Sequence, residues 1–190
     1  MVDGRAKGNR FENDVCRMLS VWVEGPQYAN AKVYTLPFRR RFTSNTPLDG
    51  HWEGEGDILH TPDIEFPFAV ECKNQEGWEL DGLVGAPKWK PWSWWEQAKD
   101  QAQRAGKLPL LIFTRKHRQV LGMLEKEVAK CLKIRPLHAP VVAVTRPLKN
   151  GLSTSGKRRR LRSKRESVVV ALMSDLMEVP RSVLLKLNQR

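Results

Sequence analysis

The chain has 190 residues, 41% of them hydrophobic, and carries a formal net charge of +12 with a pI near 10.0. This length and hydrophobic content suit one buried core, and the excess of Lys and Arg is typical of a protein that binds a polyanion, with nucleic acid as the first candidate. The apolar runs are too short to span a bilayer, the three cysteines lack zinc or disulfide spacing, and the sequence contains no Gly-rich phosphate loop. We therefore expect a soluble, cytoplasmic protein with no membrane segment and no nucleotide cofactor.

Residues 4–22 predict an amphipathic helix. Apolar residues recur at helical spacing from Phe11 to Trp22, which describes a face that packs on a sheet. Glu12 borders this face, so it either leans over the sheet toward a metal or is an ordinary helix-edge residue. Three basic residues on the first turns could meet phosphates: Arg5, Lys7 and Arg10.

The stretch 56–74, GDILHTPDIEFPFAVECKN, predicts a β-hairpin. Side chains alternate along a strand, so Glu71 and Lys73 point the same way while the neighbouring apolar residues face the core. The Pro and Asp of TPDIEFP mark a turn that connects this strand to a shorter one at 57–60. The hairpin therefore places an acid and a base together on one face.

Hairpin geometry chooses between two aspartates. Asp57 would lie next to Glu71, within the roughly 4.5 to 8 Å that separates cross-strand neighbours. Asp63 would sit on the turn, about 20 Å from Glu71 at roughly 3.3 Å per residue. We therefore expect Asp57 to work with Glu71 and Lys73.

Two carboxylates that converge on one spot repel each other unless they share a proton or bind a divalent cation. Oxygen ligands suit Mg²⁺ or Mn²⁺. A lysine beside them can hold or help deprotonate water for attack on a phosphodiester. The alternative is a surface hairpin with an ordinary Glu–Lys pair, which is the commoner meaning of an isolated E-x-K triplet. The basic composition favours the hydrolytic interpretation.

A second helix, followed by a buried strand, is predicted from WKPWSWWEQAKDQAQRAGKLPLLIF. Gln97, Gln101 and Arg104 share one face of this helix, where they either reach a scissile phosphate or are solvated. Residues 110–114 and 119–124 then predict a second hairpin around RKHR.

Five tryptophans gather between residues 78 and 95. Aromatic rings can stack on bases opened at a branch point. They can equally fill a dimer interface or a small core. Helical periodicity favours packing for Trp95, and the alternatives stay open for the others.

The composition changes after residue 147. A Gly, Ser and basic segment is typical of a flexible or DNA-ordered loop, and SVVVALMSDLMEV predicts a strand that passes into a short helix. We divide the chain into a main domain, 1–147, and an extension, 148–190, whose strand and helix pack back on the core. Candidate DNA-binding residues in the basic clusters are Arg39, Arg40, Arg41, Arg115, Lys116, Arg118, Lys157, Arg158, Arg159, Arg160, Arg162, Lys164 and Arg165.

The motifs GD at Asp57 and ECK at 71–73, with Glu12 on the first helix and a Gln-bearing second helix, resemble the PD-(D/E)xK nuclease superfamily. Within it, KGNRFEND, GDI and VECKN are most similar to archaeal-type Holliday junction resolvases and their phage relatives. The resemblance covers about residues 4–124 and implies an α/β restriction-endonuclease-like core, a mixed central β-sheet flanked by helices. The long Trp-rich insert and the C-terminal extension depart from the resolvases.

Carried onto this chain, the resemblance implies a metal site for Mg²⁺, in which Mn²⁺ substitutes. The implied ligands are Asp57, Glu71, the Cys72 backbone carbonyl and, directly or through water, Glu12. Lys73 would orient the attacking water and stabilise charge, and Gln97 would be a secondary catalytic residue.

The implied function is structure-selective cleavage of branched DNA, with the four-way junction as substrate. A homodimer follows, because two symmetric cuts across a junction need two sites. The location would be the host cytosol if a phage encodes the protein. Two alternatives stay open: another restriction- or repair-type nuclease of the superfamily that cuts duplex, flap or single-strand ends, and a non-catalytic basic nucleic-acid-binding protein.

Overall fold

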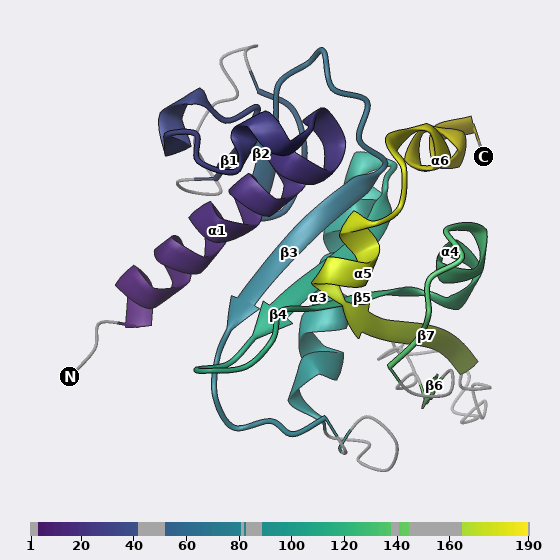
Figure 1. Cartoon of the computed structure of the whole chain (residues 1–190). Coiled ribbons are helices and arrows are strands. Elements are labelled where there is room, and N and C mark those ends of the chain that lie inside the picture. The colour runs from purple at the N-terminus through teal and green to yellow at the C-terminus, as the bar shows by residue number, and fades with distance from the viewer. Residues whose placement is uncertain are drawn as a thin grey trace, which may run out of the picture.

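The computed structural model describes residues 4–41, 52–80, 82, 89–137, 141–144 and 165–189. Within these ranges a five-stranded sheet in the order β3-β4-β5-β7-β6 forms the centre of the molecule, with helices on both sides (Figure 1). Its strands are β3 (Phe68–Asn74), β4 (Leu108–Thr114), β5 (Leu121–Glu125), β6 (Val141–Val144) and β7 (Arg165–Leu172). The helices are α1 (Gly4–Glu24), α3 (Lys90–Ala105), α4 (Lys126–Cys131), α5 (Met173–Met177) and α6 (Arg181–Leu185), with 3-10 turns η1 (Pro26–Tyr28), η2 (Val33–Thr35) and η3 (Lys186–Gln189). The predicted α/β core, a mixed sheet flanked by helices, is confirmed.

The sheet is mixed because α3 returns the chain between its first two strands. β3 and β4 are therefore parallel, with Glu71 beside Leu111. β4 and β5 follow as an antiparallel hairpin, in which Ile112 pairs with Gly122. The second hairpin predicted from the sequence is thus confirmed.

Alternation along β3 divides its side chains between two cores. Val70 and Cys72 belong to a cluster with the apolar face of α1, including Phe11 and Leu19. Their neighbours in the pleat face the opposite cluster, to which α3 contributes Trp95. The two helices thus cover opposite faces of the strand that carries the E-x-K motif.

The second cluster contains four tryptophans, Trp78, Trp89, Trp94 and Trp95, and each is at most 6% exposed. Trp78 and Trp89 meet edge to face, with ring centroids 6.3 Å apart. A ring this buried cannot stack on a base without leaving the core. The structure therefore supports the packing interpretation for these four residues.

The hairpin predicted between Asp57 and Asn74 is wrong. β2 (Ile58–His60) pairs antiparallel with β1 (Phe38–Arg40) in a separate two-stranded sheet. Ile64 and Phe66, in the connection to β3, are 3% and 4% exposed. The connection is therefore anchored in the core by these two apolar side chains, and it is not a tight turn between paired strands.

The C-terminal segment supplies an inner strand of the sheet. β7 pairs antiparallel with both β5 and β6, and α5 follows it directly, as SVVVALMSDLMEV predicts. Residues 145–164, which include the densest basic run, connect β6 to β7 and lie outside the described residues. None of the described helices combines the length and apolar character needed to cross a membrane.

Candidate active site

Glu71 and Lys73 lie on β3, at the edge of the five-stranded sheet. The side chain of Glu71 is fully buried, whereas that of Lys73 is 18% exposed. Lys73 Nζ donates a hydrogen bond to Oε1 of Glu71. The spacing predicted from the sequence therefore places a buried acid and a cation in contact, with the cation reaching toward solvent.

Asp57 lies beside β3 because Gly56 allows the chain to come close. A Cβ at Gly56 would be 2.3 Å from the carbonyl oxygen of Val70, and its φ of +92° also favours glycine. Gly56 bridges Val70 in the parallel sense, and the Asp57 N–H donates to the Val70 carbonyl at 2.8 Å. The Cys72 N–H in turn donates to Oδ2 of Asp57 at 2.8 Å. The carboxylate thus caps the open edge of the strand.

The structure brings Asp57, and not Asp63, to the E-x-K strand, although a parallel bridge does so and not the predicted hairpin. Asp63 is exposed, and a hydrogen bond from Thr61 lowers its pKa. Its other electrostatic neighbours are His60, on β2, and Arg181, on α6. The glycine before Asp57 was a signal for this close approach that the hairpin interpretation did not use.

Burial and the charge of Asp57 together raise the pKa of two neighbouring acids, Glu71 and Glu12. Burial raises the pKa of Glu71, and the charge of Asp57 raises it further, against the opposing effects of Lys73 and Gln101. Glu12, on α1, is half-buried, and its pKa is also raised by burial first and by Asp57 second. The three carboxyl groups therefore share one electrostatic environment that disfavours their joint ionisation.

A divalent cation would relieve this repulsion, and the oxygen atoms present suit one. Oε2 of Glu71 is buried without a hydrogen-bond partner. The Cys72 N–H points to Asp57 at the strand edge, and the carbonyl of a strand residue points the same way as its N–H, so the Cys72 carbonyl also faces the edge. No group of three or more His, Cys, Asp and Glu side chains in the described residues could hold a metal. The direct donors that fit are thus two carboxylates and a carbonyl, and Glu12 would take part through water, which is one of the two roles that the resemblance implies.

On α3, Gln101 is the residue that interacts with Glu71 through its side chain. Its Oε1 is buried and without a hydrogen-bond partner. Gln101 also faces the glycine beside Asp57, since a Cβ at Gly56 would be 3.2 Å from that oxygen. Gln97, chosen from the sequence as a secondary catalytic residue, is exposed one turn earlier on α3. The sequence places both glutamines on the same helical face. Which of them reaches Glu71 depends on how α3 packs against β3.

Three of the predicted basic residues lie at the end of β1. Arg40 is close enough to Glu12 to lower its pKa. The Arg39 guanidinium lies 4.4 Å from the centre of the Trp52 ring, and Arg41 contacts Glu55 at 3.1 Å. These cations are therefore held by neighbouring side chains on the α1 side of the site.

The remaining predicted basic residues fall into three groups. Lys7 and Arg115 form ion pairs with acids that follow β3. Four are exposed: Arg5, Arg10, Lys116 and Arg118. Residues 157–164 and the Arg165 side chain lie outside the described residues. The exposed members leave a positive surface around the start of α1 and the β4–β5 turn.

A mixed sheet whose edge strand carries E-x-K, with an aspartate placed against that strand by a preceding glycine, defines the PD-(D/E)xK class of nucleases. Residues 3–154 match the family model described as "Phage putative PDDEXK endonuclease". The chain belongs to that family and is a nuclease of the PD-(D/E)xK superfamily, whose members generally use divalent metals. Neither the curated proteins nor the solved structures contain a significant match to the chain.

Proposed function

We propose that the protein is a Mg²⁺-dependent, structure-selective DNA endonuclease that resolves four-way junctions. The observation that carries the hydrolytic part is the contact of Asp57 with the Cys72 N–H beside Glu71, whose buried Oε2 has no protein partner. The junction substrate rests on the resemblance of KGNRFEND, GDI and VECKN to archaeal-type resolvases.

The proposed ion would be held by Asp57, Glu71 and the Cys72 carbonyl, and Mn²⁺ would substitute for it because all three donors are oxygens. When bound, it supplies positive charge to the scissile phosphate and makes water more acidic. Neutralising the mutual repulsion of the carboxylates would also keep Glu71 ionised despite its burial.

The protein groups would then orient the reaction. Lys73, anchored on Glu71, is placed to position the attacking water and to stabilise charge on the phosphate. Gln101 would hold Glu71 from the α3 side, so it is a positioning residue. Exposed cations at the start of α1 would contact phosphates without reading sequence. In the reaction, the water oxygen forms a new P–O bond, the P–O bond to the leaving oxygen breaks, and a proton from the water ends on the leaving oxygen.

We also propose that the active form is a homodimer. Cutting two strands symmetrically across a junction requires two active sites related by a two-fold axis, and one chain supplies one. Analytical ultracentrifugation with a junction should detect two chains on one DNA molecule. A complex of one chain with one junction would contradict the dimer.

The test compares a synthetic four-way junction with duplex, flap and single-stranded DNA at equal protein concentration, with Mg²⁺, with Mn²⁺ and with EDTA. Metal-dependent paired cuts near the branch point support junction resolution. Preferential cutting of duplex or flap DNA would support the nuclease activity and contradict the junction as its substrate. DNA binding without cleavage under every metal condition would contradict the proposed activity.

A further inference from the structure

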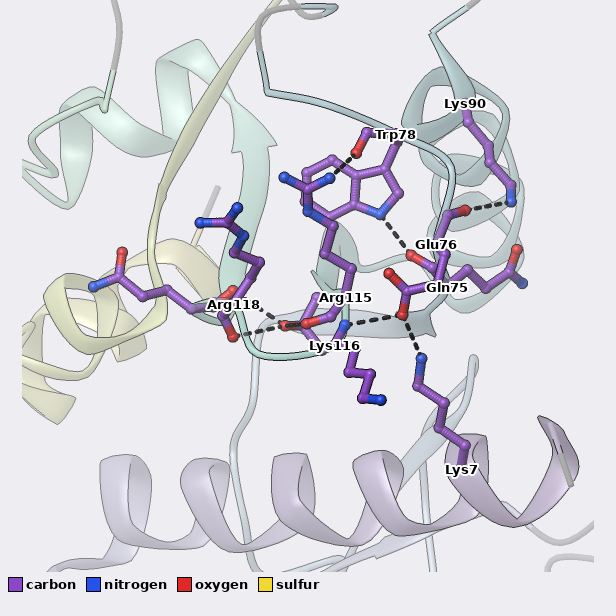
Figure 2. Close-up of polar contacts among 10 residues, drawn as sticks. Lys7, Gln75, Glu76, Trp78, Lys90, Arg115, Lys116 and Arg118 are labelled. Carbon is purple, nitrogen blue, oxygen red and sulfur yellow. Dashed lines mark hydrogen bonds and ion pairs between the residues drawn. The ribbon is translucent and has the colours of Figure 1, made fainter. Parts of the chain in front are cut away.

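Glu76, in the segment that follows β3, accepts hydrogen bonds from two elements far apart in the sequence (Figure 2). Lys7 Nζ, on α1, donates to Oε1 of Glu76 at 2.7 Å. The backbone N–H of Lys116, in the β4–β5 turn, donates to the same oxygen at 2.9 Å. An ammonium group and an amide thus converge on one anionic oxygen, and we call these two donors the Glu76 cradle.

The backbone around the cradle is held by hydrogen bonds to side chains from other parts of the chain (Figure 2). Trp78 is 6% exposed, and its Nε1 donates to the Gln75 carbonyl at 2.8 Å. Arg115, the residue before the cradle amide, donates to the Trp78 carbonyl at 2.9 Å and to Oε2 of Glu79 at 2.7 Å. Lys90 Nζ donates to the Glu76 carbonyl at 3.0 Å. These contacts hold the backbone on both sides of Glu76 and the residue that precedes the Lys116 amide, and Lys7 is carried by α1.

The carboxylate itself is loosely held. The side chain of Glu76 is 55% exposed, and its bond to Lys7 is a surface ion pair, a type of contact that contributes little net stability. Hydrogen bonds from Lys7 and from the Lys116 amide lower its pKa, so the carboxylate is charged at neutral pH. An exposed anion with few constraints can leave the cradle when another anion competes for the same donors.

The position of the cradle suggests which anion competes. Glu76 lies three residues after Lys73, about 10 Å along an extended chain, and Lys7 lies five residues before Glu12, about 7.5 Å along α1. Phosphate oxygens accept hydrogen bonds from ammonium groups and backbone amides in the same way as carboxylates do. The cradle is thus within a few nucleotides of the acids that would cut the strand.

We propose that the Glu76 cradle binds a backbone phosphate of the nucleic acid substrate, and that the Glu76 carboxylate occupies the cradle until that phosphate displaces it. The inference rests on the proposed function, since it takes DNA as the ligand. Glu76 is then an internal competitor that lowers the affinity for a strand whose phosphate must displace it from Lys7 and the Lys116 amide.

The competing role is that of a simple connector, in which Glu76 holds α1 to the turn and so helps DNA binding. The two roles predict opposite signs. Removing the charge of a competitor strengthens DNA binding, whereas removing a connector weakens it. Removing the Lys7 charge distinguishes the two roles further. If Glu76 is a competitor, this removal should weaken DNA binding only slightly in wild type, where Lys7 must first leave Glu76. In a variant with a neutral residue 76, the same removal should cost the full contact between Lys7 and the phosphate.

The experiment measures junction affinity in EDTA, which prevents cleavage, for wild type, Glu76→Gln, Lys7→Met and the double variant. Glu127→Gln is the matched control, because Glu127 is an exposed acid paired with Lys130 at 2.9 Å on α4, away from the cradle. We expect Glu76→Gln to bind about two- to fivefold more tightly than Glu127→Gln, as expected for release of an exposed ion pair. Lys7→Met should weaken binding more in the Glu76→Gln background than in wild type.

Weaker binding by Glu76→Gln, or equal effects of Lys7→Met in both backgrounds, would overturn the inference while leaving the nuclease intact. Absence of DNA binding by wild type itself would instead contradict the proposed function. Thermal unfolding of each variant checks that the fold is kept. The Lys116 amide resonance gives a second measurement, since it should shift on addition of junction DNA if a phosphate replaces the carboxylate, and an unchanged resonance would contradict the displacement.

Discussion

Replacing Asp57 with asparagine should abolish most cleavage while leaving DNA binding and the fold nearly intact. The substitution keeps the side-chain oxygen that accepts from the Cys72 N–H, so the strand edge stays capped. It removes one negative charge from the proposed metal site and leaves Glu71 as the sole carboxylate ligand there. The change is therefore confined to the chemistry of the site.

The magnitude follows from what the charge does. Stabilisation of transition-state charge by a bound metal contributes several kcal/mol, and each 1.36 kcal/mol is a tenfold change in rate. Loss of one of two carboxylate ligands should therefore slow cleavage by roughly 10² to 10⁴-fold. The Mg²⁺ concentration for half-maximal rate should rise, because the remaining oxygens attract the cation less strongly.

The assay is single-turnover cleavage of a labelled four-way junction across a Mg²⁺ titration, with binding measured separately in EDTA. Asp63→Asn is the matched control, since Asp63 is an exposed aspartate that accepts a hydrogen bond from Thr61. It should cut at a near-normal rate. An inactive Asp63→Asn protein together with an active Asp57→Asn protein would refute the assignment of the site.

Three further predictions concern neighbouring residues. Lys73→Ala should lower the single-turnover rate by about 10² to 10⁴-fold with little change in DNA affinity, and a near-normal rate would assign Lys73 to an ordinary ion pair. Gln101→Ala should reduce activity or metal affinity by about 10 to 100-fold, whereas Gln97→Ala should not, and the reverse order in a metal titration would contradict the role of Gln101. Burial, and then the charge of Lys107, lower the pKa of His60 below its ordinary value of 6.5. Around that pH the folded state therefore binds fewer protons than the unfolded state, so the free energy of unfolding should fall as the pH drops below 6.5. Urea unfolding between about pH 7.5 and 5 should show a flatter pH dependence for His60→Gln, and an equal slope in the variant would exclude His60 as the cause.

The sequence predicted those parts of the site that depend on local periodicity. Alternation along a strand is a property of the chain itself, so the common direction of Glu71 and Lys73 could be read before any fold was known. The apolar face of α1 was predictable for the same reason, and with it the half-buried position of Glu12.

The features that depend on distant parts of the chain were not predictable in this way. β2 pairs with β1, and Asp57 is placed by a parallel bridge between Gly56 and Val70. The glycine signals a close approach of two chain segments, but it does not tell a parallel bridge from a hairpin. The choice between Gln97 and Gln101 depends on how α3 lies against β3, because both residues belong to the same helical face. The contacts of Glu76 with α1 and with the β4–β5 turn likewise join segments 69 and 40 residues apart.

The late position of β7 in the chain has a consequence for synthesis. β7 pairs with β5 on one side and with β6 on the other. During synthesis, the edge of β5 that will pair with β7 therefore stays uncovered until β7 has been made. At about 5 to 20 residues per second, the roughly 40 residues between β5 and β7 take on the order of seconds to emerge. During this time the unpaired edge of β5 is open to pairing with another nascent chain, and a product that stops before residue 165 would keep that edge permanently. Truncation of the mRNA, or stalling of the ribosome, within the codons for residues 145–164 should therefore yield fragments that aggregate and not a smaller active nuclease.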